Sequence, residues 1–203
     1  SEVGDRLYFF YTAYNGKVAR VAVISIKTQD FLNRKFDAWS EPSVISPDYV
    51  DDKDSCVIPE QIDGKYMVFH RIGLNVCADF VPSLEFKHPI IRCIEIFGPR
   101  IGMWDGAKVG ISAPPIKTKK GWLLFYHGIS EHKVYRVGAL LLDLKNPTQI
   151  IARCASPILE PEMNYEMSGV VPHVVFPCGT IVEKDKVYVY YGAGDTVIGV
   201  ATG

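Results

Sequence analysis

A short polar turn followed by a run of aromatic and aliphatic residues recurs four times along the chain. Within each run, apolar residues fill or alternate over six to eight positions, which is typical of a β-strand. The copies are RLYFFY after Gly4-Asp5, KYMVFHR after Asp63-Gly64, WLLFYHG after Lys120-Gly121 and KVYVYYG after Lys184-Asp185. Their spacing of 59, 57 and 64 positions suits one antiparallel unit with its loops.

Further strands are predicted on both sides of these four runs. Each run is followed by a second apolar strand, at 18–25, 75–83, 135–144 and 196–203. A strand with Pro near its end precedes three of the runs, at 53–59, 108–114 and 171–177. Helical periodicity is weak, and 13 Pro and 17 Gly interrupt the chain. The pattern predicts an all-β repeat protein. The long repeat favours a β-propeller, which protects its strand edges by closure. The competing architecture, a linear β-solenoid, usually has shorter repeats.

Composition narrows the class of protein. The chain has 203 residues, is 48% hydrophobic and 22% charged, and has a formal net charge of -1. These values exclude a disordered chain and provide no extended basic stripe for nucleic acid. No apolar run reaches the roughly 18 residues of a membrane helix. The length suits a single domain.

The cysteines form no recognisable pattern. Their odd number and the lack of a CxxC pair argue against a disulfide framework and a structural zinc site, and favour a reducing cytoplasm. The five His are scattered without metal-ligand spacing, so no metal is predicted.

Polar residues occupy one equivalent position near the end of the four central strands. Aligning the copies on their turns brings together Tyr11, His70, His127 and Tyr191. In a propeller, equivalent positions of neighbouring blades surround one axis, so these side chains could line a pocket. They could equally form a ring that is satisfied by backbone carbonyls.

Cations recur in register in the preceding strands. Lys53 and Lys108 each lie six residues before a Pro. A Lys that enters an apolar strand is costly unless it meets an anion. With Arg71 and His127, these residues could hold a phosphate or carboxylate through charge-assisted hydrogen bonds. The alternative is that each cation pairs with a nearby acid such as Asp52, Asp54 or Asp105.

Trp104-Asp105 and the Gly192-Ala193-Gly194-Asp195 turn offer an aromatic face and carboxylates, a combination that suits a sugar. Trp104 could equally be a loop residue packed on the core. The Gly-Ala-Gly-Asp turn opens no helix, so it is not a dinucleotide-binding loop. Ser112 in GISAPP lacks the second Gly of a nucleophile elbow, which argues against a serine hydrolase.

The segments KVGISAPPIKTKKGWLLFYHGIS, YRVGALLLDL, IIARCASPILEPE, VVFPCG and YYGAGDTVIGVA resemble the β-mannoside phosphorylases of glycoside hydrolase family 130. DDKDSCVIPEQIDGKYMVFHR and DRLYFFYTAYNGKVARVAVIS are similar to earlier blades of that family. The resemblance implies a five-bladed β-propeller of which about four blades are visible. Residues 1–203 would then be a single domain without the first blade region and the C-terminal tail. It also implies that phosphate attacks a terminal β-mannosyl unit with inversion, giving α-mannose 1-phosphate.

The resemblance also implies the site residues. Phosphate would be bound by Lys53, Arg71, Lys108, His127 and Tyr135. The sugar would be bound by His70, Trp104, Asp105, Tyr191 and Asp195. The family's general acid, an Asp, is expected upstream of Ser1. No catalytic residue is therefore assigned in this chain, and the isolated chain is expected to be inactive.

The implied partners are a β-mannoside oligosaccharide and inorganic phosphate as co-substrate, without another cofactor, nucleic acid or membrane. Family members often associate, so a homo-oligomer is compatible with the resemblance. Two alternatives stay open: a β-mannosidase of the same family that uses water, and a non-catalytic sugar-binding propeller. The acceptor sugar and the linkage, β-1,4 or β-1,2, are undecided.

Overall fold

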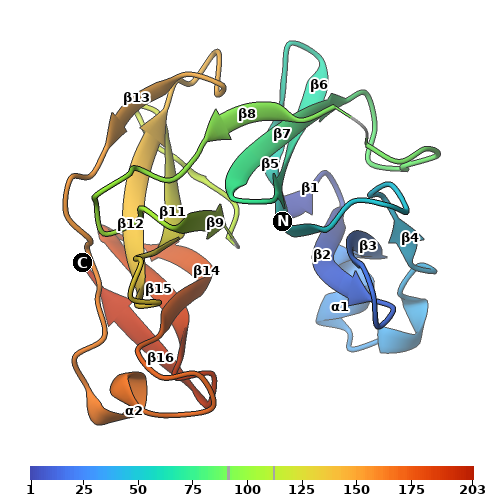
Figure 1. Cartoon of the computed structure of the whole chain (residues 1–203). Helices are drawn as coiled ribbons and strands as arrows, with labels where there is room; N and C mark the ends of the chain where they lie inside the picture. Colours follow the sequence, from blue (N-terminus) through green and yellow to red (C-terminus); the bar gives the residue numbers. More distant parts are fainter. Residues whose placement is uncertain (91, 112) are drawn as a thin grey trace. The chain divides into compact units, whose positions relative to one another are not determined.

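The structure is a computed structural model that describes residues 1–90, 92–111 and 113–203, and these residues form four antiparallel sheets in chain order (Figure 1). The chain divides into two compact units. Unit 1 comprises residues 1–73 and 77–95, and unit 2 comprises residues 74–76 and 96–203.

The first two sheets each have four strands. The first has the order β1 (Glu2–Val3), β2 (Arg6–Tyr14), β3 (Ala19–Lys27) and β4 (Ser43–Val44). The short helices α1 (Thr28–Leu32) and η1 (Phe36–Ala38) lie between β3 and β4. The second has the order β5 (Asp52–Ile62), β6 (Lys65–Ile72), β7 (Asn75–Val81) and β8 (Ile94–Phe97).

The last two sheets belong to unit 2. In the third, β10 (Ile116–Lys117), β11 (Trp122–Ile129), β12 (Tyr135–Leu142) and β13 (Ile150–Arg153) lie in that order, and β9 (Lys108–Ile111) also pairs with β11. The fourth has the order β14 (Val175–Glu183), β15 (Lys186–Ala193) and β16 (Val197–Thr202). Helix α2 (Asn164–Met167) precedes it.

The predicted repeat is confirmed, because the four aromatic runs form β2, β6, β11 and β15. The turns explain the hairpins: Asp63 and Gly64 both have positive φ, at 49° and 74°, as a tight two-residue hairpin turn requires. The strands that follow the four runs are also present. Among the preceding strands, the one expected at 171–177 begins later, at Val175, and residue 112 of the one at 108–114 lies outside the described residues.

Each unit buries an apolar core between two of its sheets. In unit 1, alternate residues of β3, β5 and β6 meet, including Val21, Val57 and Val68. In unit 2, Phe125 and Val137 pack with Val175 and Val189 of the next sheet. This is how period-two strands bury one face against a neighbour, and the all-β prediction is confirmed.

The cysteine prediction is wrong for one pair. Cys77 and Cys93 form a disulfide, whereas Cys56, Cys154 and Cys178 stay reduced. The odd number and wide spacing concealed the pair, because the strands β7 and β8 bring residues 16 positions apart to a Cα–Cα distance of 5.1 Å. The cytoplasmic location stays a prediction.

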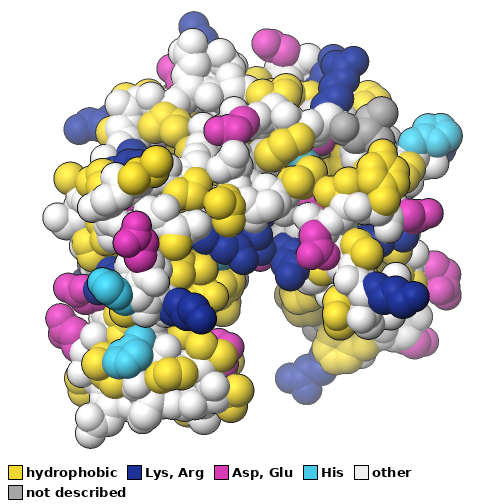
Figure 2. Space-filling model, viewed as in Figure 1, with side chains coloured by type: hydrophobic (Ala, Val, Ile, Leu, Met, Phe, Trp, Pro, Cys, Tyr) yellow, Lys and Arg dark blue, Asp and Glu magenta, His cyan; other side chains and the backbone are white. Residues whose placement is uncertain are grey.

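Surface and helix properties add two observations. Basic and acidic side chains are interspersed with hydrophobic ones over the face shown in Figure 2. Within the described residues, every helix is too short or too polar to cross a membrane.

Candidate functional site

Lys53 and Arg71 lie directly opposite each other in β5 and β6, so their side chains share one face of the second sheet. The next pair in register is Cys56 and Phe69. Two residues of β5 therefore stand opposite one residue of β6, which is a β-bulge. The bulge residue Asp54 has a φ of 53°.

The bulge directs a carboxylate at Arg71. Arg71 Nε donates to Asp54 Oδ2 at 2.5 Å, and its Nη1 donates to the Gly73 carbonyl at 2.7 Å. The buried guanidinium is thereby fixed in one orientation. For Arg71, the structure thus shows the pairing with a nearby acid that the sequence left as an alternative to anion binding.

Lys108, His127 and Tyr135 share one face of the third sheet. Lys108 of β9 and Tyr135 of β12 both lie opposite Ile129 of β11, and His127 lies two residues before Ile129. The His127 ring contacts the Phe176 ring of β14 in a tilted arrangement, with 4.3 Å between centroids, and its centroid lies 6.1 Å from that of Tyr135. Three of the five predicted phosphate residues are therefore brought together within unit 2.

These two groups occupy corresponding positions in their own sheets. Lys53 and Lys108 lie where β5 and β9 begin, and Arg71 and His127 lie near the ends of β6 and β11. Antiparallel pairing puts the start of one strand beside the end of the next, so each group gathers at one end of its sheet. Lys53 and Arg71 belong to unit 1 and the others to unit 2, and their convergence on one anion stays a prediction.

His70 is buried and has two protein partners. Its Nδ1 lies 2.9 Å from Asp52 Oδ1, and its Nε2 lies 3.1 Å from Asp79 Oδ2. Burial lowers the pKa of His70, but the hydrogen bonds to Asp52 and Asp79 outweigh burial and raise the pKa to about 9. The protonated ring donates to both carboxylates, so both ring nitrogens have protein partners. The sugar contact of His70 stays a prediction.

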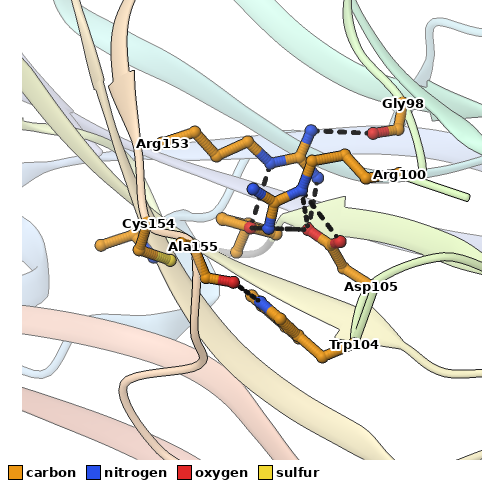
Figure 3. A network of polar contacts seen from close by, with 9 residues as sticks. Gly98, Arg100, Trp104, Asp105, Arg153, Cys154 and Ala155 are labelled. Carbon is orange, nitrogen blue, oxygen red and sulfur yellow. Dashed lines mark hydrogen bonds and ion pairs between the residues drawn. The ribbon is translucent and has the colours of Figure 1, made fainter. Parts of the chain in front are cut away.

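Asp105 is also buried and is held by cations (Figure 3). Arg100 binds both of its oxygens, with Nη2 at 2.8 Å from Oδ2, and Arg153 Nη2 lies 2.6 Å from the same oxygen. The Tyr126 hydroxyl donates to Oδ2 at 2.8 Å. Burial raises the pKa of Asp105, but the contacts with Arg100, Tyr126 and Arg153 outweigh burial and lower it. Asp105 is therefore held in internal ion pairs, as the nearby-acid alternative expected, and its sugar contact stays a prediction.

Trp104 packs on the sheet face that lies opposite to His127. Its ring stacks on Tyr126 at 5.6 Å, and its Nε1 donates to the Ala155 carbonyl at 3.0 Å. Two glycines make room for the indole: a Cβ added to Gly128 or Gly138 would approach Trp104 within 2.5 or 2.6 Å. The structure thus matches the alternative in which Trp104 is a loop residue packed on the core.

The two remaining predicted sugar residues differ from each other. Tyr191 is buried, and its hydroxyl donates to Glu166 Oε1 at 2.7 Å. Glu166 Oε2 accepts the backbone N–H groups of Glu162 and Met163, both at 2.8 Å. Tyr191 thereby anchors the loop around α2. Asp195 is exposed in the turn between β15 and β16, with a φ of 49°.

Sequence reasoning missed the partners that hold these side chains. Arg153 lies 48 residues after Asp105, and Glu166 lies 25 residues before Tyr191. No local sequence pattern predicts contacts over such separations. Asp52 and Asp54 were available in the sequence as acids beside the cations, but strict alternation along β5 would have placed these two residues, which are two positions apart, on the same face.

Comparison with known proteins decides the family. A sequence family described as beta-1,4-mannooligosaccharide phosphorylase matches residues 1–203. The chain belongs to glycoside hydrolase family 130. Two relatives from Thermoanaerobacter sp. (strain X514) are a 1,2-beta-oligomannan phosphorylase, 41% identical over 96% of this family 130 chain, and a beta-1,2-mannobiose phosphorylase, 39% identical over 99% of it. This chain spans 62% and 64% of their lengths.

A solved structure agrees with this assignment. The beta-1,2-mannobiose phosphorylase from Listeria innocua, in complex with beta-1,2-mannobiose, has a TM-score of 0.85 and 32% identity to this chain. The match covers all of this chain and 55% of that protein. The fold of the family 130 chain is therefore shared with a phosphorylase that was seen with a mannoside bound.

Proposed function

We propose that the protein cleaves terminal β-mannosides with inorganic phosphate and inversion, releasing α-mannose 1-phosphate. The four sheets would be blades of a five-bladed propeller. The relatives named as phosphorylases support this function. The observation that carries it is the placement of Lys53 opposite Arg71, and of Lys108 on the same sheet face as His127, at one end of each sheet.

The chemistry of phosphate fits these residues. A phosphate dianion needs cations and N–H donors, which Lys53, Arg71 and Lys108 supply. Phosphate then takes the place that an inverting hydrolase reserves for water, and a fixed anion gains the advantage of proximity. Because phosphate is already ionised, the site needs no strong general base. This set favours phosphorolysis over the hydrolytic alternative.

We also propose that turnover needs residues other than 1–203. The family resemblance implies a general acid that residues 1–203 do not supply, and the chain spans less than two thirds of the relatives' lengths. Loss of a general acid costs about 10²- to 10⁴-fold in rate. Residues 1–203 alone should therefore release no measurable sugar phosphate.

For the linkage, we propose β-1,2. The two Thermoanaerobacter relatives and the Listeria innocua structure are all named for β-1,2-linked mannosides. The description of the sequence family names the β-1,4 linkage, which is the competing specificity.

The test is an assay of the protein encoded by the gene with β-1,2-mannobiose or β-1,4-mannobiose, with and without phosphate. We expect α-mannose 1-phosphate only when phosphate is present, and a faster reaction with the β-1,2 substrate. Lys108→Met should raise the KM for phosphate at least about tenfold, since one charge-assisted contact is lost. The matched control Lys87→Met, at a side chain that is 79% exposed, should leave it unchanged. Free mannose released without phosphate would overturn the proposal.

A further inference from the structure

The β-bulge in β5 separates two sets of polar side chains onto opposite faces of the second sheet. Lys53 and Arg71 share one face. Asp52 and His70 are their neighbours in β5 and β6, and adjacent strand residues point to opposite faces. Behind the cations, therefore, lies the pair of Asp52 and His70, joined at 2.9 Å.

This pair is the centre of a buried polar network within unit 1. Ser46 Oγ accepts from the Val21 N–H at 2.8 Å and donates to Asp52 Oδ2 at 2.7 Å. On the other side, Asp79 accepts from the Arg92 N–H at 3.0 Å. The network joins β3, β5, β6 and β7. Ser46, Asp52, His70 and Asp79 are all buried, so each of these bonds is shielded from water.

Only a protonated imidazole satisfies both carboxylates. It donates from both ring nitrogens, at 2.9 Å to Asp52 and 3.1 Å to Asp79. A Gln amide donates only from its nitrogen, so its oxygen would face one carboxylate. A buried carboxylate without its partner is strongly destabilising. His70 therefore holds β5 against β6 beside the bulge.

We propose that His70, with Asp52 and Asp79, is a positioning residue that fixes the bulge and so sets Lys53 and Arg71 for phosphate. The inference rests on the proposed function. The bulge residue Asp54 connects the two sets, because it follows Lys53 in β5 and binds Arg71 Nε at 2.5 Å. A shift of β5 against β6 would move Lys53 and Asp54 of β5 relative to Arg71 of β6.

The first experiment compares His70→Gln with Val68→Ala in the protein encoded by the gene. Val68 is buried, lies two residues from His70 in β6 and points to the same face, but belongs to the apolar core. Both variants lose stability. We expect His70→Gln to raise the KM for phosphate at least tenfold with a smaller change in kcat, while Val68→Ala stays within twofold.

The second experiment restores the hydrogen bonds without the charge. In His70→Gln with Asp79→Asn, the Gln nitrogen donates to Asp52 and the Gln oxygen accepts from the Asn amide. We expect at least half of the lost phosphate affinity to return.

Asp52 from β5 and Asp79 from β7 face the imidazole, so loss of its proton near pH 9 leaves a nitrogen lone pair against a carboxylate. In the wild type, the KM for phosphate should rise between pH 8 and 10. In the double variant, this rise should be absent.

The outcomes separate the two proposals. If His70→Gln behaves like Val68→Ala, or the double variant keeps the pH step, the positioning role is wrong. If the wild type makes no sugar phosphate, the proposed function is wrong. Calorimetry with inorganic phosphate then tests the positioning role, which fails if wild type and His70→Gln bind phosphate equally or neither binds it.

Discussion

Unit 1 and unit 2 each bury a carboxylate in a polar network, but the partners differ. Asp52 faces a histidine, whereas Asp105 faces two arginines and a tyrosine. An arginine keeps its charge at every accessible pH, whereas a histidine does not. The ion pairs in the network of unit 2 therefore persist as the pH rises. The network of unit 1 makes both of its His70 hydrogen bonds only while His70 carries a proton.

The largest expected effect comes from breaking the permanent network. Asp105→Asn leaves Arg100 and Arg153 without their anion, and removing one partner of a buried ion pair costs about 3–5 kcal/mol. The control Glu160→Gln breaks the exposed pair with Arg136, which contributes about 1 kcal/mol or less. Urea denaturation measures both variants. Equal midpoints would show that the Asp105 network adds little stability.

The second effect is a pH dependence of stability that is expected in unit 1 and not in unit 2. The folded pKa of His70, about 9, exceeds its ordinary value of 6.5, so its stabilisation is complete below pH 6.5 and is lost as the pH rises through 9. The shift corresponds to roughly 3 kcal/mol. Amide exchange, corrected for intrinsic rates, should accelerate in β5–β7 over this range but show no such step in β11 and β12. An unchanged slope in His70→Gln would contradict this origin.

The smallest effect concerns Tyr191, a third buried contact with a carboxylate. Tyr191→Phe removes one donor from Glu166, which keeps its two backbone donors, and should cost about 1–2 kcal/mol. Tyr190→Phe, at the neighbouring exposed residue, is the control. Differential scanning calorimetry gives the stability, and faster exchange of residues 162–174 would locate the loss in the loop around α2. A change in Tyr190→Phe as large as in Tyr191→Phe would argue against the hydrogen bond as its cause.

The sequence predicted the strands well because strand formation here is local. Turn residues with positive φ and period-two hydrophobicity were sufficient to locate β2, β6, β11 and β15. The loop between β13 and β14 was less predictable. Its helix α2 is held by the long-range bond between Glu166 and Tyr191, which no local signal reveals.

The candidate site was predictable in its residue types but not in its orientations. Register recurrence pointed correctly to Lys53 and Lys108 as strand-initial cations. For His70, Asp105 and Tyr191, the sequence showed polar side chains at blade ends but not their partners. A bulge such as that at Asp54 changes which face a residue occupies, and one sequence does not reveal it.

The main-chain bridge between Tyr135 and Val174 links two sheets of unit 2. Tyr135 pairs in parallel with Val174, and its N–H donates to the His173 carbonyl at 2.9 Å. The spacing of the Tyr135 and Phe176 rings is thereby governed by backbone atoms, which side-chain substitutions leave intact. Substitutions of Tyr135 or Phe176 can consequently change what these rings recognise, while the backbone bridge that aligns the two sheets stays intact.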